Sequence, residues 1–212
     1  MRQVPDEAKW YAALSKLNAL LVNDKGVVAS REFKTIVNVA PYNPTTGKPY
    51  DKVFFGLGQY ESQADYDALT AKYTANPPAD LLSYFSTNIP LNNGSILVKP
   101  YRDTPTLDVK NFIQTGQVLE IAIRDVSKYT NFNDFDTKRA AFVTLLKKQN
   151  GVVKELEYRS VDGKYYVGMT IYENQQKFFA IISNPAVVQS AEITALINSY
   201  PPMINQFGVA YP

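Results

Sequence analysis

Residues 151–173, GVVKELEYRSVDGKYYVGMTIYE, decide the fold because they read as two β-strands joined by a tight turn at Asp162-Gly163. Asp-Gly is a preferred pair for the two-residue turn of a β-hairpin. A related stretch occurs earlier in the chain, which indicates an internal repeat. Before the turn the two copies match at an offset of 125 positions: Gly26-Val27-Val28 corresponds to Gly151-Val152-Val153, and Glu32-Phe33 corresponds to Glu157-Tyr158. Beyond the turn the offset is 112 positions, and Gly56, Tyr60 and Glu61 correspond to Gly168, Tyr172 and Glu173.

The segments around both hairpins extend each copy into the order β-α-β-β-α-β. In the second copy, Leu119, Ile121 and Ile123 alternate with polar residues as in a half-buried strand. In the first copy the expected elements around the hairpin are helices over 5–22, 62–73 and 79–87 and a strand over 95–101. In the second copy they are a strand over 117–128, a helix from Asn131 or Asn133 to 149, helices over 175–183 and 191–199, and a strand over 207–211. This is the ferredoxin-like order, with a four-stranded antiparallel sheet covered by helices on one face.

The uncovered sheet face of each copy is apolar enough to need a partner, and a tandem copy supplies one. We therefore predict an α+β fold with antiparallel sheets. Residues 1–102 and 103–212 are expected to form two ferredoxin-like units that pair as an intrachain pseudo-dimeric barrel.

The first unit lacks an obvious leading strand, because the counterpart of strand 117–128 would fall before residue 1. Either that strand has been lost or trimmed, or another segment takes the empty edge. We favour residues 106–113 for this edge, since they contain the apolar run LDVKNFI and an open sheet edge invites aggregation.

Composition excludes several kinds of chemistry. The chain has no Cys and no His, which removes thiolate nucleophiles, cysteine-ligated zinc and the commonest general base and haem ligand. The net charge is only +2 and the charges are interspersed, so we expect neither nucleic acid nor membrane as a partner. We also expect no cofactor and no metal. No long apolar run occurs, which predicts a soluble protein that is cytoplasmic or exported with its signal segment removed.

Three stretches, VLEIAIRDV, LLKKQNGVVKELEYRS and DGKYYVGMTIYENQQKFFAI, resemble the dimeric α+β barrel superfamily, especially antibiotic-biosynthesis-monooxygenase-like domains. The resemblance covers residues 117–211 well and 8–101 more faintly. It implies a family of cofactor-independent quinone-forming monooxygenases, haem-degrading enzymes, isomerases and domains without known activity. Haem-binding members depend on a His that is absent here, and no exact motif of the cofactor-free members is present.

Four residues of the second unit are candidates for ligand binding. Arg124 projects from the face opposite Leu119, where it would anchor an anionic or phenolic ligand or form an ion pair. Tyr158, Tyr166 and Tyr172 lie on the hairpin, where their hydroxyls would meet a ligand or simply be satisfied within the sheet core. Gly56 and Gly168 leave room for a ligand or a bulge, or for a large neighbour from the facing sheet. We identify no catalytic residue.

Two functions follow from these features. The first is a tandem α+β barrel that binds a small apolar or aromatic ligand or acts as a structural or interaction module, either as a monomer (pseudo-dimer) or as a homodimer. The alternative is a cofactor-independent monooxygenase acting on a phenolic or quinol aromatic substrate. The alternative requires a closed pocket of roughly a few hundred Å³ with converging polar groups, open to Arg124 and the tyrosines, and it fails if Phe135, Phe142 and the hairpin aromatics fill that space.

Overall fold

The structure is a computed structural model that describes residues 1–91 and 95–211. The strands are β1 (Arg2–Gln3), β2 (Val27–Ala40), β3 (Val53–Tyr60), β4 (Ile89–Pro90), β5 (Val98–Pro100), β6 (Val118–Asp125), β7 (Val152–Ser160), β8 (Tyr165–Tyr172) and β9 (Ile204–Ala210). The helices are α1 (Glu7–Leu21), α2 (Gln63–Ala75), α3 (Ala79–Ser86), α4 (Phe132–Lys147), α5 (Gln175–Ile182), α6 (Pro185–Val188) and α7 (Ala191–Ser199), with a short 3-10 helix over Val126–Lys128. Among these residues, no helix is both long and apolar enough to span a bilayer.

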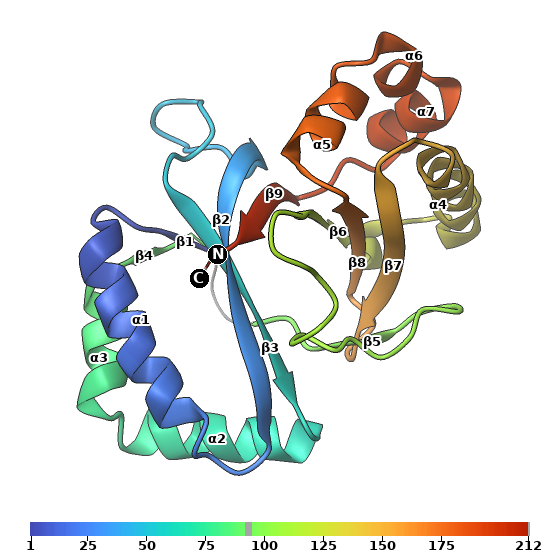
Figure 1. Ribbon diagram of the computed structural model, residues 1–212. Coiled ribbons are helices and arrows are strands. Elements are labelled where there is room, and N and C mark those ends of the chain that lie inside the picture. The colour runs from blue at the N-terminus through green and yellow to red at the C-terminus, as the bar shows by residue number, and fades with distance from the viewer. Residues whose placement is uncertain (92–94, 212) are drawn as a thin grey trace.

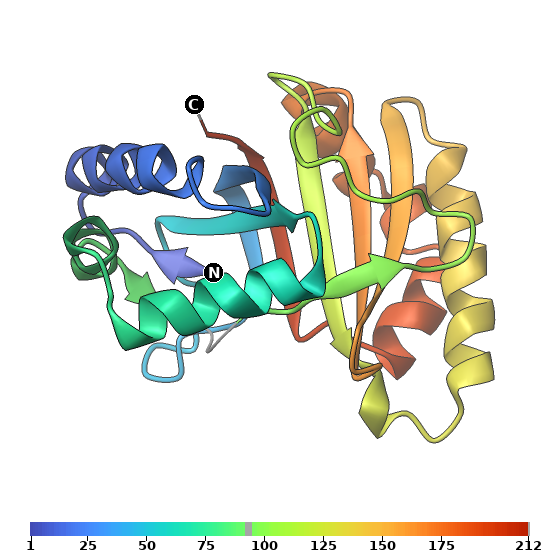
Figure 2. The same cartoon turned by 90° about the horizontal axis from the view of Figure 1, so that it is seen from below.

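The described strands form one antiparallel sheet in the order β4-β1-β3-β2-β9-β6-β8-β7-β5. Its first four strands and the set β9-β6-β8-β7 follow the same ferredoxin-like order. Helices α1 to α3 cover the first half and α4 to α7 cover the second, so that the sheet lies between two helical layers (Figures 1 and 2). The α+β fold with two ferredoxin-like units in one barrel is therefore as predicted.

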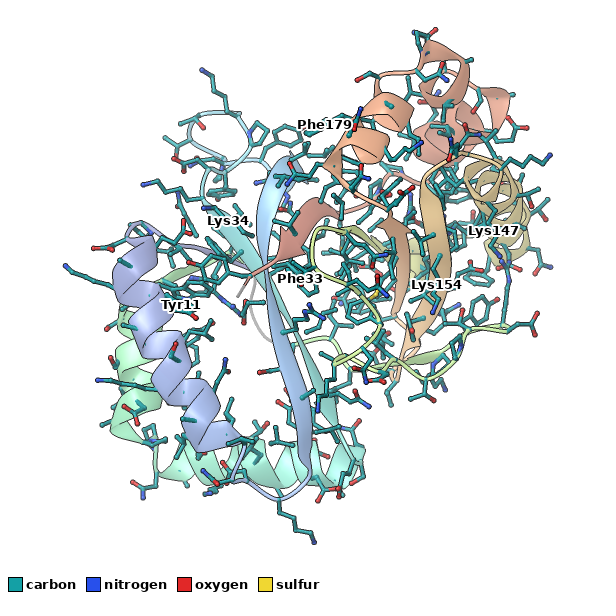
Figure 3. The ribbon with its side chains drawn as sticks, in the orientation of Figure 1. Tyr11, Phe33, Lys34, Lys147, Lys154 and Phe179 are labelled. Atoms are coloured by element: carbon teal, nitrogen blue, oxygen red, sulfur yellow. The ribbon has the colours of Figure 1, made fainter. Side chains whose placement is uncertain are left out.

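The barrel core is built by the inward faces of both halves. Phe33 and Phe55 from the first half stack at 5.0 Å and join the apolar side chains of β6, β7 and β8 in one cluster. Figure 3 labels Phe33 on β2, close to where β9 crosses between the halves. Because side chains of a strand alternate between its faces, the opposite residues of the same strands meet the helices.

The two sides of the barrel are joined differently. On one side β9 pairs with both β2 and β6, with two register shifts along β2, so a single strand bridges the halves. On the other side, β4 pairs with β1, and β5 pairs with β7. The strands β4 and β5 are the two ends of the sheet. The described residues between them, Leu91 and 95–97, are not in a strand. This side of the barrel is therefore incompletely closed.

The leading strand of the first half is β1, which pairs with both β3 and β4. Our assignment of 106–113 to this place was wrong, because that segment contains no strand. Its apolar residues instead cover one end of the barrel, where Val109 and Ile113 are buried. The segment is fixed by the Arg31 guanidinium, which donates to the Ile113 carbonyl at 2.8 Å, and by Gln59, which accepts from the Val109 amide at 2.8 Å.

The layers between sheet and helices differ in the two halves. In the first half this layer centres on Trp10, whose ring lies 4.4 Å from that of Phe54, and it also holds one ion pair, between Arg2 and Glu32. In the second half, α4 places Phe135 and Arg139 on its buried face, and Arg139 meets buried carboxylates on β7. The helix–sheet layer of the second half is therefore partly ionic.

Candidate functional site

A cavity of about 260 Å³ lies inside the barrel, on its incompletely closed side. Both halves supply its walls, which are mostly apolar. The apolar lining includes Phe55, Leu57, Ile121, Ile123, Val167 and Met169, together with 96–98 from the segment before β5. This space can therefore hold an apolar molecule away from water.

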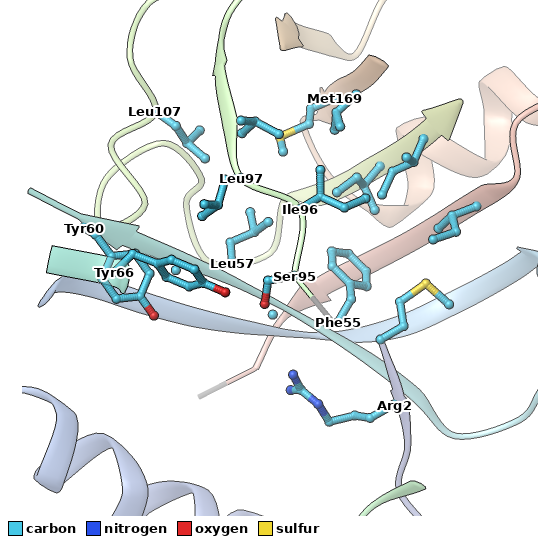
Figure 4. Close-up of a pocket in the computed structure, with 18 residues that line it drawn as sticks. Arg2, Phe55, Leu57, Tyr60, Tyr66, Ser95, Ile96, Leu97, Leu107 and Met169 are labelled. Atoms are coloured by element: carbon cyan, nitrogen blue, oxygen red, sulfur yellow. The ribbon is translucent and has the colours of Figure 1, made fainter. Parts of the chain in front are cut away.

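The polar lining of this cavity gathers at one side. Figure 4 shows the hydroxyl groups of Tyr60, Tyr66 and Ser95 below the apolar side chains of Leu57 and Met169. The rings of Tyr60 and Tyr66 pack edge to face at 5.1 Å, and burial raises the pKa of Tyr60, so its hydroxyl stays protonated at neutral pH. Neither tyrosine hydroxyl has a hydrogen-bond partner among the residues that the structure describes. Each can therefore donate to a ligand.

Arg2 is the charged side chain in the lining. Its guanidinium pairs with the Glu32 carboxylate and lies over the Tyr84 ring at 5.4 Å from the centroid. Gly56 provides the space for this pair, since a Cβ atom there would lie 2.5 Å from a Glu32 oxygen. The guanidinium is thus held in place before any ligand arrives.

A second hollow of about 270 Å³ adjoins the cavity on the outside of Tyr60 and Tyr66. Both tyrosines, Leu97 and Leu107 line the two spaces in common, and Gln63 on α2 lines the outer one. The two tyrosines therefore form part of the wall of both spaces.

The four predicted site residues are divided between the two faces of the sheet. Arg124, Tyr166 and Tyr172 lie on the helix-facing side, as expected from their alternation with the apolar residues of β6 and β8. Tyr158 lies on the inner face, where its hydroxyl donates to the Pro105 carbonyl at 3.3 Å and its ring borders the outer hollow.

The three helix-facing residues are buried and engaged with protein groups. Arg124 donates from Nε to the Tyr200 carbonyl at 2.7 Å, and burial lowers its pKa to about 10. Tyr172 donates to a Glu120 oxygen at 2.8 Å. Tyr166 accepts from Arg139 Nε at 2.7 Å and donates to Glu157. The Phe135 ring fills the adjacent space and lies 5.0 Å from that of Tyr166. None of the three lines the barrel cavity.

The sequence analysis missed the ionic cluster around Arg139. Arg139 Nη2 lies 3.0 Å from Glu155 Oε2, and its Nε lies 3.6 Å from Glu157 Oε1. Gly168 leaves the room that this guanidinium needs, since a Cβ atom there would lie 2.8 Å from Arg139 Nη2. The expected large neighbour of Gly168 therefore comes from α4 and not from the facing sheet. An arginine on the apolar stripe of the helix, four residues after Phe135, was the available signal.

Burial is the largest influence on the pKa values of Glu155 and Glu120. Burial raises the pKa of Glu155 to about 7, although Arg139 favours its charged form, and it also raises the pKa of Glu120. Within the described part of the chain, no group of three or more acidic side chains is arranged to hold a metal ion.

Comparisons with known proteins agree with the barrel fold. An anthrone oxidase-like protein superimposes with a TM-score of 0.57 at 10% identity, covering 99% of this chain and 89% of the other. A provisionally assigned monooxygenase of Fusobacterium nucleatum superimposes with a TM-score of 0.50 at 11% identity, covering 99% and 87%. The sequence matches no protein-family profile, and no curated protein matches it. At these identities the likeness establishes the fold alone.

Proposed function

We propose that this protein binds a small aromatic or otherwise apolar molecule in the barrel cavity. The observation that carries this proposal is an apolar space bordered at one side by the hydroxyls of Tyr60, Tyr66 and Ser95. A ligand with an apolar ring and one polar substituent would bury the ring between the two halves. Its substituent would pair with the tyrosine hydroxyls, which have no hydrogen-bond partner among the described residues.

The cavity volume limits the size of this ligand. A dry protein cavity of about 150 Å³ accepts benzene. The 260 Å³ available here therefore suits one ring or two fused rings rather than a three-ring system. A ligand of about ten heavy atoms with micromolar affinity would gain roughly 8 kcal/mol on binding, which lies within the range known for small ligands.

A cofactor-independent monooxygenase acting at Arg124 and the helix-facing tyrosines is not supported, because Phe135 fills the space beside them. Such an activity is the second candidate function only if it uses the barrel cavity. Its support is the fold shared with proteins described as an anthrone oxidase-like protein and a provisionally assigned monooxygenase. In such a reaction the ring supplies the electrons, and one atom of O2 enters as a carbonyl oxygen while the other leaves as water. The described lining of the cavity contains no carboxylate to take up the phenolic proton, and Arg2 is its charged side chain. Ligand binding is therefore the better-supported function.

We further propose that residues 1–102 and 103–212 are two copies of one unit and that the protein acts as a monomer. The support is the strand order common to both halves and the pairing of β9 with both β2 and β6 within one chain. Dimeric barrels of this kind obtain the facing sheet from a second chain, which this chain does not need.

The methionine side chains provide a direct test. Met169 lines the cavity, whereas Met203 lies on the surface and is 47% exposed. In a protein with 13C-labelled methionine methyl groups, titration with 2-naphthol should shift the Met169 signal and leave that of Met203 in place. The variant Val167→Phe, which fills the cavity, should abolish the shift, and Val153→Phe at an exposed position should retain it. An unchanged Met169 signal with both phenol and 2-naphthol at saturating concentration would reject the proposed ligand class.

Oxygen consumption separates the two candidate functions. If 2-naphthol shifts Met169 and O2 is consumed in proportion to a quinone product, the oxygenase candidate is supported. Binding without oxygen uptake supports a binding protein.

A further inference from the structure

The ionic cluster of the second half is not required by the fold. At the offset of 125 positions, Arg139 corresponds to Leu14, which is buried in the apolar layer under α1. Glu155 likewise corresponds to the uncharged Ser30, whereas Glu157 corresponds to Glu32, which pairs with Arg2; the first half thus packs its helix on the sheet without a counterpart of the Arg139–Glu155 pair. Burying ions costs desolvation free energy that apolar residues do not incur. The buried Arg139–Glu155 pair of the second half therefore needs an explanation other than helix packing, and the groove beside it supplies one.

A groove of about 350 Å³ runs beside this cluster, between α4, β7 and residues 102–105. It exists because β5 pairs only with the end of β7, from Tyr158 to Ser160. The next residues of β7 are covered by the chain after β5, where the Thr104 hydroxyl accepts from the Glu157 amide at 2.9 Å. Beyond this point the outer edge of β7 borders the groove.

Glu155 connects the groove to the ionic cluster. Its side chain is only 1% exposed, and its Oε2 is held by Arg139 at 3.0 Å. Its other oxygen, Oε1, has no hydrogen-bond partner within the described residues, and the residue lines the groove. A buried acceptor without a donor is costly and uncommon in native proteins. A hydroxyl group of a ligand in the groove would satisfy it.

The charges around the groove favour an anionic ligand. Lys147, at the end of α4, and Lys154, on β7, both line it and are exposed (Figure 3). No ion pair links either lysine to another described residue. Arg102, in contrast, is already paired with Asp136 at 2.6 Å and with Glu157 at 3.1 Å. Asp103 is an acidic residue at the same groove, so the ligand's negative charge is expected near the two lysines.

We propose that this groove is a second binding site, separate from the barrel cavity, for a small anion that carries a hydroxyl group. The hydroxyl donates to Glu155 Oε1, and the negative charge lies between Lys147 and Lys154. Hydroxycarboxylates and phosphorylated polyols both have this chemistry. The ion pair of Arg139 with Glu155 Oε2 fixes the orientation of the carboxylate, and it leaves the buried Oε1 without a donor from the described residues.

Paired probes test the hydroxyl and the charge separately. L-lactate carries a hydroxyl group that propionate lacks. For the phosphorylated class, glycerol 3-phosphate carries hydroxyl groups on its carbon atoms, and sulfate is the matching anion without them. In titrations of the intact chain followed by calorimetry or by amide chemical shifts, one hydroxylated anion should bind with a Kd of about 1 mM or tighter, and its partner at least about tenfold more weakly. Which hydroxylated probe binds identifies the source of the anion. Equal affinity for lactate and propionate, and for glycerol 3-phosphate and sulfate, would overturn the proposal.

Lysine variants keep the test independent of folding. Lys147→Gln combined with Lys154→Gln should weaken binding of the hydroxylated anion about tenfold or more, whereas Lys16→Gln, an exposed lysine on α1, should leave it unchanged. Glu155→Gln should remove the preference for the hydroxylated probe. If the double lysine variant and Lys16→Gln have the same affinity for the hydroxylated anion, the binding is that of an adventitious anion at the surface and the site is rejected. The double variant should retain the Met169 response to 2-naphthol, so failure here is distinguishable from failure of the cavity proposal.

Discussion

The raised pKa of Glu155 makes a prediction about stability that can be worked out from the structure. Replacing Glu155 by Gln removes the titrating proton while keeping the size of the side chain. In the folded protein burial raises the pKa of Glu155 from 4.5 to about 7. The groups that face it are Arg139 from α4, Thr170 from β8 and, farther along the sheet, Glu120 from β6. The folded state therefore holds a proton that the unfolded state has already lost between these two pKa values.

The sign and size of the effect follow from proton linkage. Because the folded-state pKa is the higher one, the stability that this proton contributes is fully present below about pH 4.5 and is lost as the pH rises through about 7. Each pKa unit corresponds to about 1.4 kcal/mol, so the wild-type protein should lose roughly 2–3 kcal/mol between pH 5 and pH 8 relative to Glu155→Gln. Glu120 titrates in both proteins, and its contribution largely cancels in the difference.

The assay is urea denaturation of both proteins at several pH values between about 5 and 8. The free energy of unfolding of Glu155→Gln minus that of the wild type should rise with pH and level off above the folded-state pKa. Glu192→Gln, on the exposed side of α7, controls for the loss of one negative charge. A difference that stays constant within about 0.5 kcal/mol across this range would refute the reasoning.

Three further substitutions test other parts of the structure. Arg139→Leu, which copies the residue of the first half, should cost about 3–5 kcal/mol at neutral pH because it leaves Glu155 buried without its cation and Glu157 with Arg102 alone, and less under acid conditions; an unchanged urea midpoint would contradict this. Trp10→Ala should cost about 3–5 kcal/mol by opening a cavity in the apolar layer of the first half, measured by thermal unfolding, and a loss below 1 kcal/mol would show that this layer contributes little. Gly163→Ala should cost about 1–2 kcal/mol, because φ is +75° in the hairpin turn, and a neutral result by urea denaturation would mean that the turn is not held in this conformation.

Much of the fold could be predicted because its signals are local. The hairpin turn, the alternation of β6 and the caps of the helices depend on neighbouring residues, and α7 begins and ends where we expected it. The error at 106–113 has a physical origin. An apolar segment that covers the end of a barrel buries the same kinds of residue as a strand, so its sequence does not separate the two. The two residues of β1 are too few to show any periodicity.

The candidate site was harder to predict because it depends on how the halves meet. Alternation along β6 correctly placed Arg124 opposite the apolar face, but its burial under the Tyr200 carbonyl results from the packing of α7 and the chain that follows it. The barrel cavity combines residues from both halves with the segment before β5, and no single stretch of sequence contains that pattern. Gly56 and Gly58 on the return strand β3 were its local sign, since both line the cavity.

The pairing of β9 with β2 also affects how the chain is made. The hydrogen bond between Thr35 and Gln206 spans 171 positions, so β2 is synthesised long before the strand that covers its edge. At about 5–20 residues per second, the ribosome needs roughly ten to thirty seconds to bridge that interval. Throughout this time the nascent first half carries an uncovered edge strand and an inner face that still awaits the second half. During translation this open edge favours aggregation, and slow codons placed before β9 would lengthen that exposure.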